Sequence, residues 1–371
     1  MSELLHKLQK AVEDKWITKR DHSTLPISIY TYSKRTEIEN NWNDITKICR
    51  GLIVDNSGNI IANPFPKFFN IGEQSKEKVC GTKLLKHSLG EFYIPEGNYK
   101  VLSKEDGSLI IVCVYQGQLV VASKGSFESE QAKIAKKFIE DKYNKTKFDY
   151  NYTYLFELIY KEGRIVVDYK DEEALYLLGI RSNSGVDMSY DYCEFFANKF
   201  NFKQAKIYNK TIEECLDEIN IPYDNREGYV IHFDDGNKLK IKFQAYMQLH
   251  KIMTDITSKD ILESIERGES IIDFCTDKNV PDEMIDEIKA VEREFITDYE
   301  NLEDQAKSYV LEAQKIENQK EQALYVMNNV PKKINGIVFA MLRGKEYDKY
   351  IFTILKNQEK ENRKFIGTCA K

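Results

Sequence analysis

The spacing of apolar residues changes near residue 250, and this change constrains the fold more than any other feature of the sequence. Before it, short runs rich in β-branched and aromatic residues alternate with turn signals, as in sheets with flanking helices. After it, apolar residues recur every three or four positions, as on one face of an amphipathic helix. We therefore predict an α+β domain of antiparallel sheets over residues 1–250 and an all-α domain over residues 251–371.

Individual elements can be placed within this pattern. The first domain should contain strands at residues 26–33, 51–54 and 59–62, a helix at 129–143, and hairpins at 108–123, 152–169 and 228–243. The expected turns are Gln116-Gly117, Lys161-Glu162-Gly163 and Asp235-Gly236, and the last of these is a strong hairpin signal. In the second domain, the apolar spacing over residues 288–309 predicts one long helix, or two that join near Asn301.

Composition excludes several classes of protein. Hydrophobic residues make up 42% of the 371 residues, which is enough for a packed core and excludes wholesale disorder. The longest strongly apolar stretch, residues 109–115, is far shorter than a membrane span, and the charged N-terminus lacks the apolar core of a signal peptide. We therefore expect a cytoplasmic protein that does not enter a membrane. The seven cysteines are scattered and odd in number, and the five histidines form no metal-binding pair, so we expect neither disulfides nor a zinc site.

Charge is segregated along the chain. The net charge of −6 argues weakly against a nucleic-acid partner. Residues 251–330, however, carry 9 basic and 20 acidic residues, whereas residues 331–371 carry 10 basic and 4 acidic residues. Aromatic residues are interleaved with this basic stretch, which suits RNA contacts. The basic residues concerned are Lys332, Lys333, Arg343, Lys345, Lys349, Arg363 and Lys364. The alternative is a charged helical bundle that faces water and only stabilises the core.

The sharpest local feature is the segment S-K-E-D-G-S at residues 103–108, where a lysine at a strand end is followed by an acid and a glycine. By itself, this segment also fits a surface turn with a solvated lysine. Further along the chain come Lys124-Gly125, Glu157, Glu227-Gly228, and the pair Lys240 and Lys242. The two lysines of this last pair alternate with apolar residues, so both should lie on one face of a strand. A solvated strand face would show the same alternation.

Glu157 lies in the apolar run Y-L-F-E-L-I-Y. A buried carboxylate is costly unless it has a partner, so this position indicates either a functional site or a structural pair. The structural alternative is an ion pair with an arginine such as Arg164.

Taken together and in order, K-E-D-G, S-K-G, F-E, E-G-Y-V and K-L-K-I-K resemble the motifs of covalent nucleotidyltransferases. These are the ATP-dependent DNA ligases, the RNA ligases and the mRNA capping enzymes. Upstream, Cys49-Arg50-Gly51 and the run P-K-F-F-N at residues 66–70 narrow the resemblance to RNA ligases of the bacteriophage tRNA-repair type, the RNA ligase 1 family. The motifs cover residues 30–250, and the C-terminal third is similar only in size and helical character.

The resemblance implies a role for each matched residue. Lys104 would be the nucleophile that becomes adenylated, and Lys240 and Lys242 would contact the α-phosphate. Glu227 would hold a catalytic Mg²⁺, with Asp106 as a second ligand, and Mn²⁺ could substitute for this ion. The remaining nucleotide-binding set is Arg50 and Lys67 for the β- and γ-phosphates, Lys124 beside the nucleotide or an RNA phosphate, Glu157 for the ribose hydroxyls, Glu105, Gly107 for close approach of the backbone, and Phe69 for the adenine pocket.

The chemistry of the nucleophile can be argued independently of the resemblance. A lysine amine attacks only when it is neutral, and at a pKa of about 10.4 roughly 1 in 2,500 molecules is neutral at pH 7. Lowering that pKa by about three units is worth about 4 kcal/mol. Lys240, Lys242 and a bound metal ion would each disfavour the charged form of Lys104.

The implied function is an ATP-dependent RNA ligase that acts through lysyl-AMP and adenylated RNA and joins 3′-OH and 5′-phosphate ends, such as those of a cleaved tRNA anticodon loop. We expect a monomer with ATP and Mg²⁺ as cofactors. The alternatives are a DNA ligase, a GTP-using capping-type enzyme and a non-catalytic RNA-binding relative. DNA ligases and capping enzymes usually carry a five-stranded oligonucleotide-binding barrel, and residues 251–371 show no such pattern.

Overall fold

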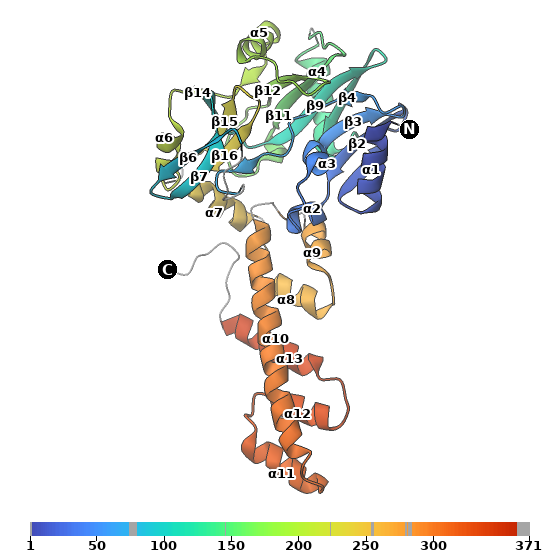
Figure 1. Cartoon of the computed structure of the whole chain (residues 1–371), viewed down its shortest axis with the longest axis vertical. Helices are drawn as coiled ribbons and strands as arrows, with labels where there is room; N and C mark the ends of the chain where they lie inside the picture. Colours follow the sequence, from blue (N-terminus) through green and yellow to red (C-terminus); the bar gives the residue numbers. More distant parts are fainter. Residues whose placement is uncertain are drawn as a thin grey trace. The chain divides into compact units, whose positions relative to one another are not determined.

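The computed structural model describes residues 2–73, 80–144, 146–222, 224–253, 256–278, 280 and 284–361. Arg363 and Lys364, which we included among the candidate RNA contacts, lie outside these ranges. The chain divides into two units, Met1–Met253 and Thr254–Lys371. The change of apolar spacing near residue 250 lies next to this division. Figure 1 shows sheets with flanking helices in the first unit and helices in the second.

Three sheets and one separate hairpin form the first unit (Figure 1). The four-stranded sheet has the order β1 (Ile17–Asp21), β2 (Ile27–Tyr32), β3 (Arg50–Asp55), β4 (Ile60–Ala62). One five-stranded sheet has the order β10 (Gln118–Ser123), β9 (Ser108–Tyr115), β11 (Tyr152–Ile159), β12 (Ala174–Ser182), β13 (Lys203–Gln204). The other has the order β14 (Ile207–Tyr208), β8 (Tyr99–Ser103), β15 (Gly228–Phe233), β16 (Lys238–Lys242), β5 (Phe69–Asn70), and the hairpin is β6 (Thr82–His87) with β7 (Gly90–Pro95).

Helices cover these sheets. They are α1 (Glu3–Glu13), α2 (Lys34–Ile38), α3 (Asp44–Ile48), α4 (Glu130–Asp141), the 3₁₀ turn η1 (Lys161–Gly163), α5 (Tyr190–Phe200), α6 (Ile212–Asp217) and α7 (Gln244–Met253). Helix α4 begins after Ser129, whose hydroxyl accepts a hydrogen bond from the Ala132 amide. Its apolar face, including Phe138 and Ile139, packs against strands β9–β12 in one continuous core.

Two of the three predicted hairpins are confirmed, and one is wrong. Strands β9 and β10 pair across a two-residue turn, and so do β15 and β16 across a longer one. Strand β11 does not pair with residues 164–169, because its neighbours are β9 and β12. The amides of Val166 and Val167 instead donate to the buried carboxylate of Asp106, at 2.9 and 2.8 Å. A side chain thus satisfies backbone groups that we had assigned to a sheet.

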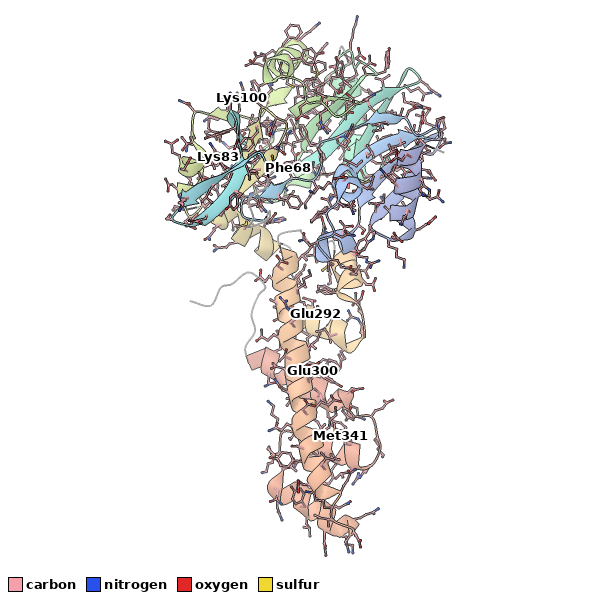
Figure 2. All side chains as sticks on the ribbon, viewed as in Figure 1. Phe68, Lys83, Lys100, Glu292, Glu300 and Met341 are labelled. Carbon is pink, nitrogen blue, oxygen red and sulfur yellow. The ribbon has the colours of Figure 1, made fainter. Side chains whose placement is uncertain are left out.

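The described elements of the second unit are all helices: α8 (Ser258–Glu266), α9 (Ile271–Asp277), α10 (Ile285–Ala313), α11 (Gln319–Asn329), α12 (Asn335–Leu342) and α13 (Asp348–Glu361). Helix α10 runs unbroken through Asn301, so the long apolar pattern is one helix. Figure 2 shows Glu292 and Glu300 on this helix and Met341 on α12. Buried aliphatic side chains from α8, α10, α11, α12 and α13 form the core of this unit. Within the described ranges, no helix combines the length and the apolar character that a membrane crossing requires.

Candidate active site

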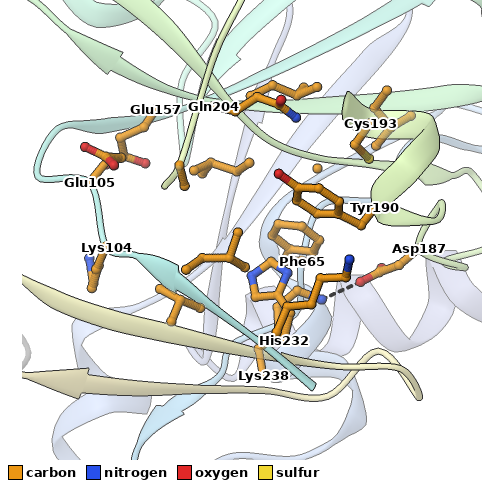
Figure 3. Close-up of a pocket in the computed structure, with 18 of the residues that line it drawn as sticks. Phe65, Lys104, Glu105, Glu157, Asp187, Tyr190, Cys193, Gln204, His232 and Lys238 are labelled. Atoms are coloured by element: carbon orange, nitrogen blue, oxygen red, sulfur yellow. Dashed lines mark hydrogen bonds and ion pairs between the residues drawn. The ribbon is translucent and has the colours of Figure 1, made fainter. Parts of the chain in front are cut away.

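A cavity of about 730 Å³ lies between the two five-stranded sheets of the first unit. Its lining comes from strands of both sheets, and the loops after β8 and β12 complete it. Figure 3 shows the charged side chains of Lys104, Glu105 and Glu157 at one end. Phe65 and His232 lie toward the other end, where burial lowers the pKa of His232 to about 3 and keeps its imidazole neutral. Lys238 and Asp187 form an ion pair beside Phe65 and His232, so charged side chains lie at both ends of the cavity.

Half of the predicted site residues line this cavity, and several others touch those that do. The lining set is Arg50, Lys104, Glu105, Gly107, Glu157 and Lys240. Lys104 follows β8, whose neighbour β15 begins directly after Glu227, so the pairing of these two strands brings the two residues together. Lys242 ends β16 beside the same point. Residues that are 138 positions apart in the sequence thus meet at one end of a sheet.

Glu227 forms two ion pairs inside the protein. One carboxylate oxygen lies 2.8 Å from Lys104 Nζ and the other 3.0 Å from Lys242 Nζ, and the side chain is nearly inaccessible to solvent. Although burial by itself raises the pKa of Glu227, the two ammonium groups hold it below its usual range. Glu227 is therefore ionised at neutral pH. Lys104 must leave this ion pair before its amine can attack an electrophile.

The surroundings of Lys240 strongly disturb its protonation. Burial, followed by the charges of Lys67 and Lys104, lowers the pKa of Lys240 to about 7. Its ammonium lies 5.0 Å from the centre of the Phe68 ring, and the Arg50 guanidinium lies 5.4 Å from the same ring. We had expected crowded cations to act on Lys104, and the structure shows that they act strongly on Lys240.

Glu157 is paired with a backbone amide and not with an arginine. Its Oε1 accepts a hydrogen bond of 3.1 Å from the Gly107 amide, and burial raises the pKa of this carboxyl to about 7. Arg164, the structural partner that we considered, lies 3.4 Å from Asp168 instead. A Cβ at Gly107 would lie 2.4 Å from the Leu158 carbonyl oxygen, so this glycine lets the loop approach β11 closely.

Asp106 holds the loop that follows Lys104 to its surroundings. Besides the amides of Val166 and Val167, its carboxylate accepts a hydrogen bond of 2.7 Å from the Tyr246 hydroxyl. Both oxygens are thus used within the fold, and the side chain is buried. In this arrangement both oxygens of Asp106 support the fold, and its role as the second metal ligand stays a prediction. Tyr246, on the helix that follows the K-L-K-I-K strand, was missed because the sequence does not show what it faces.

Phe69 also differs from its predicted place. It is not among the residues that line the cavity, whereas its neighbour Phe68 is. Consecutive residues of an extended chain point to opposite sides, so only one of the two phenylalanines can face the cavity. The Phe69 ring packs edge-on against Trp42 at 5.5 Å, on the side where Lys67 lies.

Lys124 lies near Lys67 and Trp42, because all three contact Tyr32. The Lys124 ammonium is 3.3 Å from the Tyr32 hydroxyl. Glu105 accepts hydrogen bonds from Ser103 and from Tyr169, the latter at 2.9 Å. The Tyr169 hydroxyl in turn accepts a hydrogen bond from the Asp106 amide, also at 2.9 Å. These contacts fix the loop on both sides of Lys104.

The described residues do not include a group of three or more His, Cys, Asp or Glu side chains that could hold a metal ion. Glu227 is a single carboxylate beside Lys104, and its oxygens are held by lysine side chains that can move. Mg²⁺ is often bound by one or two carboxylates together with substrate phosphates. The donor set therefore fits a divalent ion that arrives with a polyphosphate.

The sequence is similar to those of several known proteins. The profile of a family described as RNA ligase matches residues 48–253. A putative bifunctional polynucleotide kinase/RNA ligase of Autographa californica nuclear polyhedrosis virus is 28% identical over 222 residues, which are 55% of this chain and 30% of the viral protein. The RNA ligase of Rhodothermus phage RM378 is 23% identical over 280 residues, 58% of this chain and 62% of the phage protein. The chain thus spans less than two thirds of the length of either relative.

Among solved structures, a variant of the Naegleria gruberi RNA ligase with ATP and manganese is 19% identical, with a TM-score of 0.33 over 41% of this chain and 51% of that one. An archaeal ATP-dependent RNA ligase is 11% identical, with a TM-score of 0.43 over 70% of this chain and 64% of that one. The family profile covers more than half of the sequence, including Lys104, Glu227 and Lys242. By this match, the chain belongs to the RNA ligase family.

Proposed function

We propose that the protein is an ATP-dependent RNA ligase that joins 3′-OH and 5′-phosphate ends through a lysyl-AMP at Lys104. The observation that carries the proposal is the cavity, which brings Lys104, Glu157 and Lys240 together with the Glu227–Lys242 pair directly behind them. A non-catalytic RNA-binding protein has no need for charged groups buried at such cost. The relatives described as RNA ligases support the same reaction.

The shape of the cavity supports one orientation of the nucleotide. Glu157 would bind the ribose hydroxyls, and Lys240 with Lys242 would contact the α-phosphate next to Lys104. The base would then enter the part of the cavity that Leu102, Val230 and the segment 177–180 line. The β- and γ-phosphates would extend toward Arg50, Lys67 and Lys124. This placement replaces our expectation that Phe69 lines the base pocket.

In the adenylation step, Lys104 Nζ would attack the α-phosphorus, and the bond to pyrophosphate would break in line with the attack. Lys240 and Lys242 would stabilise the charge that develops on the α-phosphate oxygens. Glu227 would hold Mg²⁺ or Mn²⁺ through one oxygen, and the ion would supply further positive charge at the phosphates. Lys104 would attack as the neutral amine, after its ammonium group has given up a proton to solvent.

The later steps would pass AMP from Lys104 to an RNA 5′-phosphate and then release it as a 3′-hydroxyl attacks. We assign adenylation to the first unit and selection of the RNA, such as a cleaved tRNA anticodon loop, to the second. Exposed basic side chains support this assignment: Lys332, Lys333, Arg343, Lys345 and Lys349. We also propose that the protein acts as a monomer in the cytoplasm of its cell or host.

Incubation with Mg²⁺ and α-³²P-labelled ATP or GTP, followed by denaturing electrophoresis and peptide mapping, tests the proposal. Label from ATP on Lys104 is the expected result. Label from GTP alone would indicate a capping-type enzyme. No label from either, after pyrophosphate has stripped any pre-existing adenylate from a folded protein, would contradict the proposal.

A further inference from the structure

Three aromatic rings surround the ammonium group of Lys67. Its Nζ lies 5.2 Å from the centre of the Tyr32 ring, 4.8 Å from Trp42 and 5.6 Å from Phe69. All three distances are within the range of about 6 Å in which a ring quadrupole attracts a cation. We call Tyr32, Trp42 and Phe69 the aromatic cage.

The rings of the cage also hold one another. Trp42 meets Tyr32 at 5.1 Å with an interplanar angle of 84°, and it meets Phe69 at 5.5 Å with an angle of 79°. Both are edge-to-face contacts, which are favourable arrangements for aromatic pairs. Trp42 is thus the central ring, because it contacts both of the others.

The chain fixes Trp42 through its neighbours. The next residue, Asn43, caps helix α3 and completes a capping box with Thr46. The same helix supplies the Lys47 carbonyl, which accepts a hydrogen bond of 2.8 Å from the Lys67 amide. One short helix therefore positions both the central ring of the cage and the backbone of the lysine inside it.

The cage lies close to the part of the cavity that Lys240 lines. Lys124 lies over the Tyr32 ring at 4.6 Å, so two cations share one ring. The cage residue Phe69 lies on β5, which pairs with β16 so that Phe69 lies opposite Leu239 and its neighbour Asn70 lies opposite Lys240. Such proximity suits a cation that contacts the outer phosphates of a nucleotide whose α-phosphate lies at Lys240.

We propose that Trp42 is a positioning residue, which holds the Lys67 ammonium in place for the β- and γ-phosphates of ATP and for departing pyrophosphate. The inference rests on the proposed function and deepens it, because it adds a residue outside the predicted motifs to the phosphate-binding end. A lysine side chain has several rotatable bonds, and the cage restricts them before the nucleotide arrives. The alternative is that Trp42 only packs the loop between α2 and α3.

The test compares Trp42→Leu, which removes the ring, with Trp42→Phe, which keeps an aromatic face. Trp16→Leu is the matched control, because Trp16 is the other tryptophan of the chain and packs against Arg35 at 4.0 Å, not against Lys67. We expect Trp42→Leu to raise the KM for ATP about 3- to 30-fold, from the usual strength of such contacts, with a smaller change in kcat. Trp42→Phe should restore most of the affinity, and Trp16→Leu should leave it unchanged.

Two further measurements separate positioning from packing. Sealing of chemically pre-adenylated RNA needs no β- or γ-phosphate, so Trp42→Leu should leave its rate within about twofold of wild type. In a double-mutant cycle, Trp42→Leu should cost little once Lys67 has been changed to Met. An equal loss in sealing of pre-adenylated RNA, or full additivity of the two substitutions, would overturn the inference.

Calorimetric titration with inorganic pyrophosphate measures the same contact without catalysis. The dissociation constant should rise about 3- to 30-fold in Trp42→Leu, and not in Trp16→Leu. If the wild-type protein forms no adenylate but the titrations show this difference between the variants, the proposed function is contradicted and the inference is supported. If the wild-type protein forms adenylate and neither variant changes pyrophosphate binding, the inference is contradicted and the proposed function is supported.

Discussion

The two units of the chain differ in where their clusters of charged side chains lie. In the first unit, Lys104, Glu227 and Lys242 are largely buried within one cluster. In the second unit, ion pairs such as Lys307–Glu303, at 2.8 Å, lie on the surface of helix α10. Surface pairs of this kind contribute little to stability, and buried clusters are costly to assemble. The comparison shows that the proposed catalytic residues lie in the unit where charged side chains are buried and therefore costly.

The largest effect should come from removing Lys104, the proposed nucleophile. Lys104→Ala should abolish enzyme–AMP formation, because the variant has no amine at that position, and the protein should remain folded. Denaturing electrophoresis with labelled ATP measures the adenylate, and circular dichroism checks the fold. Lys100→Ala is a matched control, because this lysine lies on β8, the strand that Lys104 follows, and its ammonium lies 4.4 Å from the centre of the Tyr190 ring. Label that persists on Lys104→Ala would refute the assignment.

Asp106→Ala should be the most destabilising single change at the site. It leaves the amides of Val166 and Val167 and the Tyr246 hydroxyl without their acceptor, which should cost about 3 kcal/mol of the free energy of unfolding. Urea denaturation measures this loss. Tyr246→Phe removes only one of the three hydrogen bonds and should cost about 1 kcal/mol.

A metal-binding role for Asp106 would give a different result. Asp106→Ala would then be nearly as stable as wild type, and its adenylation would require much more Mg²⁺. That outcome would return Asp106 to the metal site and remove the contrast between it and Glu227.

Burial of Lys240 should lower the free energy of unfolding of the unliganded protein at neutral pH. The pKa of Lys240 is about 10.5 in the unfolded chain and about 7 in the folded one, so between these pH values the folded state binds fewer protons. Stability should therefore rise with pH across this window. Lys240→Met should remove the rise and should stabilise the protein at pH 7 by about 1–2 kcal/mol. A variant that is less stable than wild type at pH 7 would contradict this account.

Glu157 provides the opposite case at lower pH. Burial raises the pKa of its carboxyl from 4.5 to about 7, so the folded state binds more protons than the unfolded state between these values. Stability should fall as the pH rises through this window. Glu157→Gln should flatten the fall, as thermal denaturation at several pH values can show. An unchanged pH profile in this variant would mean that Glu157 is ionised throughout the window.

The smallest effect should come from the surface of the second unit. Lys332→Ala combined with Lys333→Ala removes two exposed charges next to Pro331 and should weaken RNA binding a few-fold. The slope of log K against log salt should become shallower by about 0.7 for each RNA phosphate that these lysines neutralise, and adenylation should not change. Lys307→Ala on the acidic helix α10 is the matched control. An unchanged slope would favour a bundle that only stabilises the fold.

Much of the site could be predicted because the motifs follow strands. Lys240 and Lys242 alternate with Leu239 and Ile241, and this period places both lysines on one face of β16, as observed. The hairpin at Asp235-Gly236 and the helix over residues 129–143 were equally clear, because local turn and capping chemistry determines them. The proposed roles of these residues stay predictions until the adenylate is mapped.

The wrong hairpin and the unexpected hydrogen bonds of Asp106 share one cause. Residues 164–169 and Asp106 meet partners that are far away in the sequence. Asp106 is 60 residues from Val166 and 140 from Tyr246. Such pairings leave no trace in local spacing, so the sequence did not show which groups Asp106 contacts.

The sequence by itself determined the division into two kinds of structure and the family, because apolar period and ordered motifs are local properties of the chain. Only the tertiary structure decided which charged and aromatic groups the motif residues contact. Glu227 forms ion pairs with two lysines, burial and neighbouring cations lower the pKa of Lys240, and an aromatic cage surrounds Lys67. Each of these depends on distances of a few ångströms between strands and loops that are remote in sequence. Electrostatic and ring interactions vary steeply over such distances, and no one-dimensional pattern encodes them.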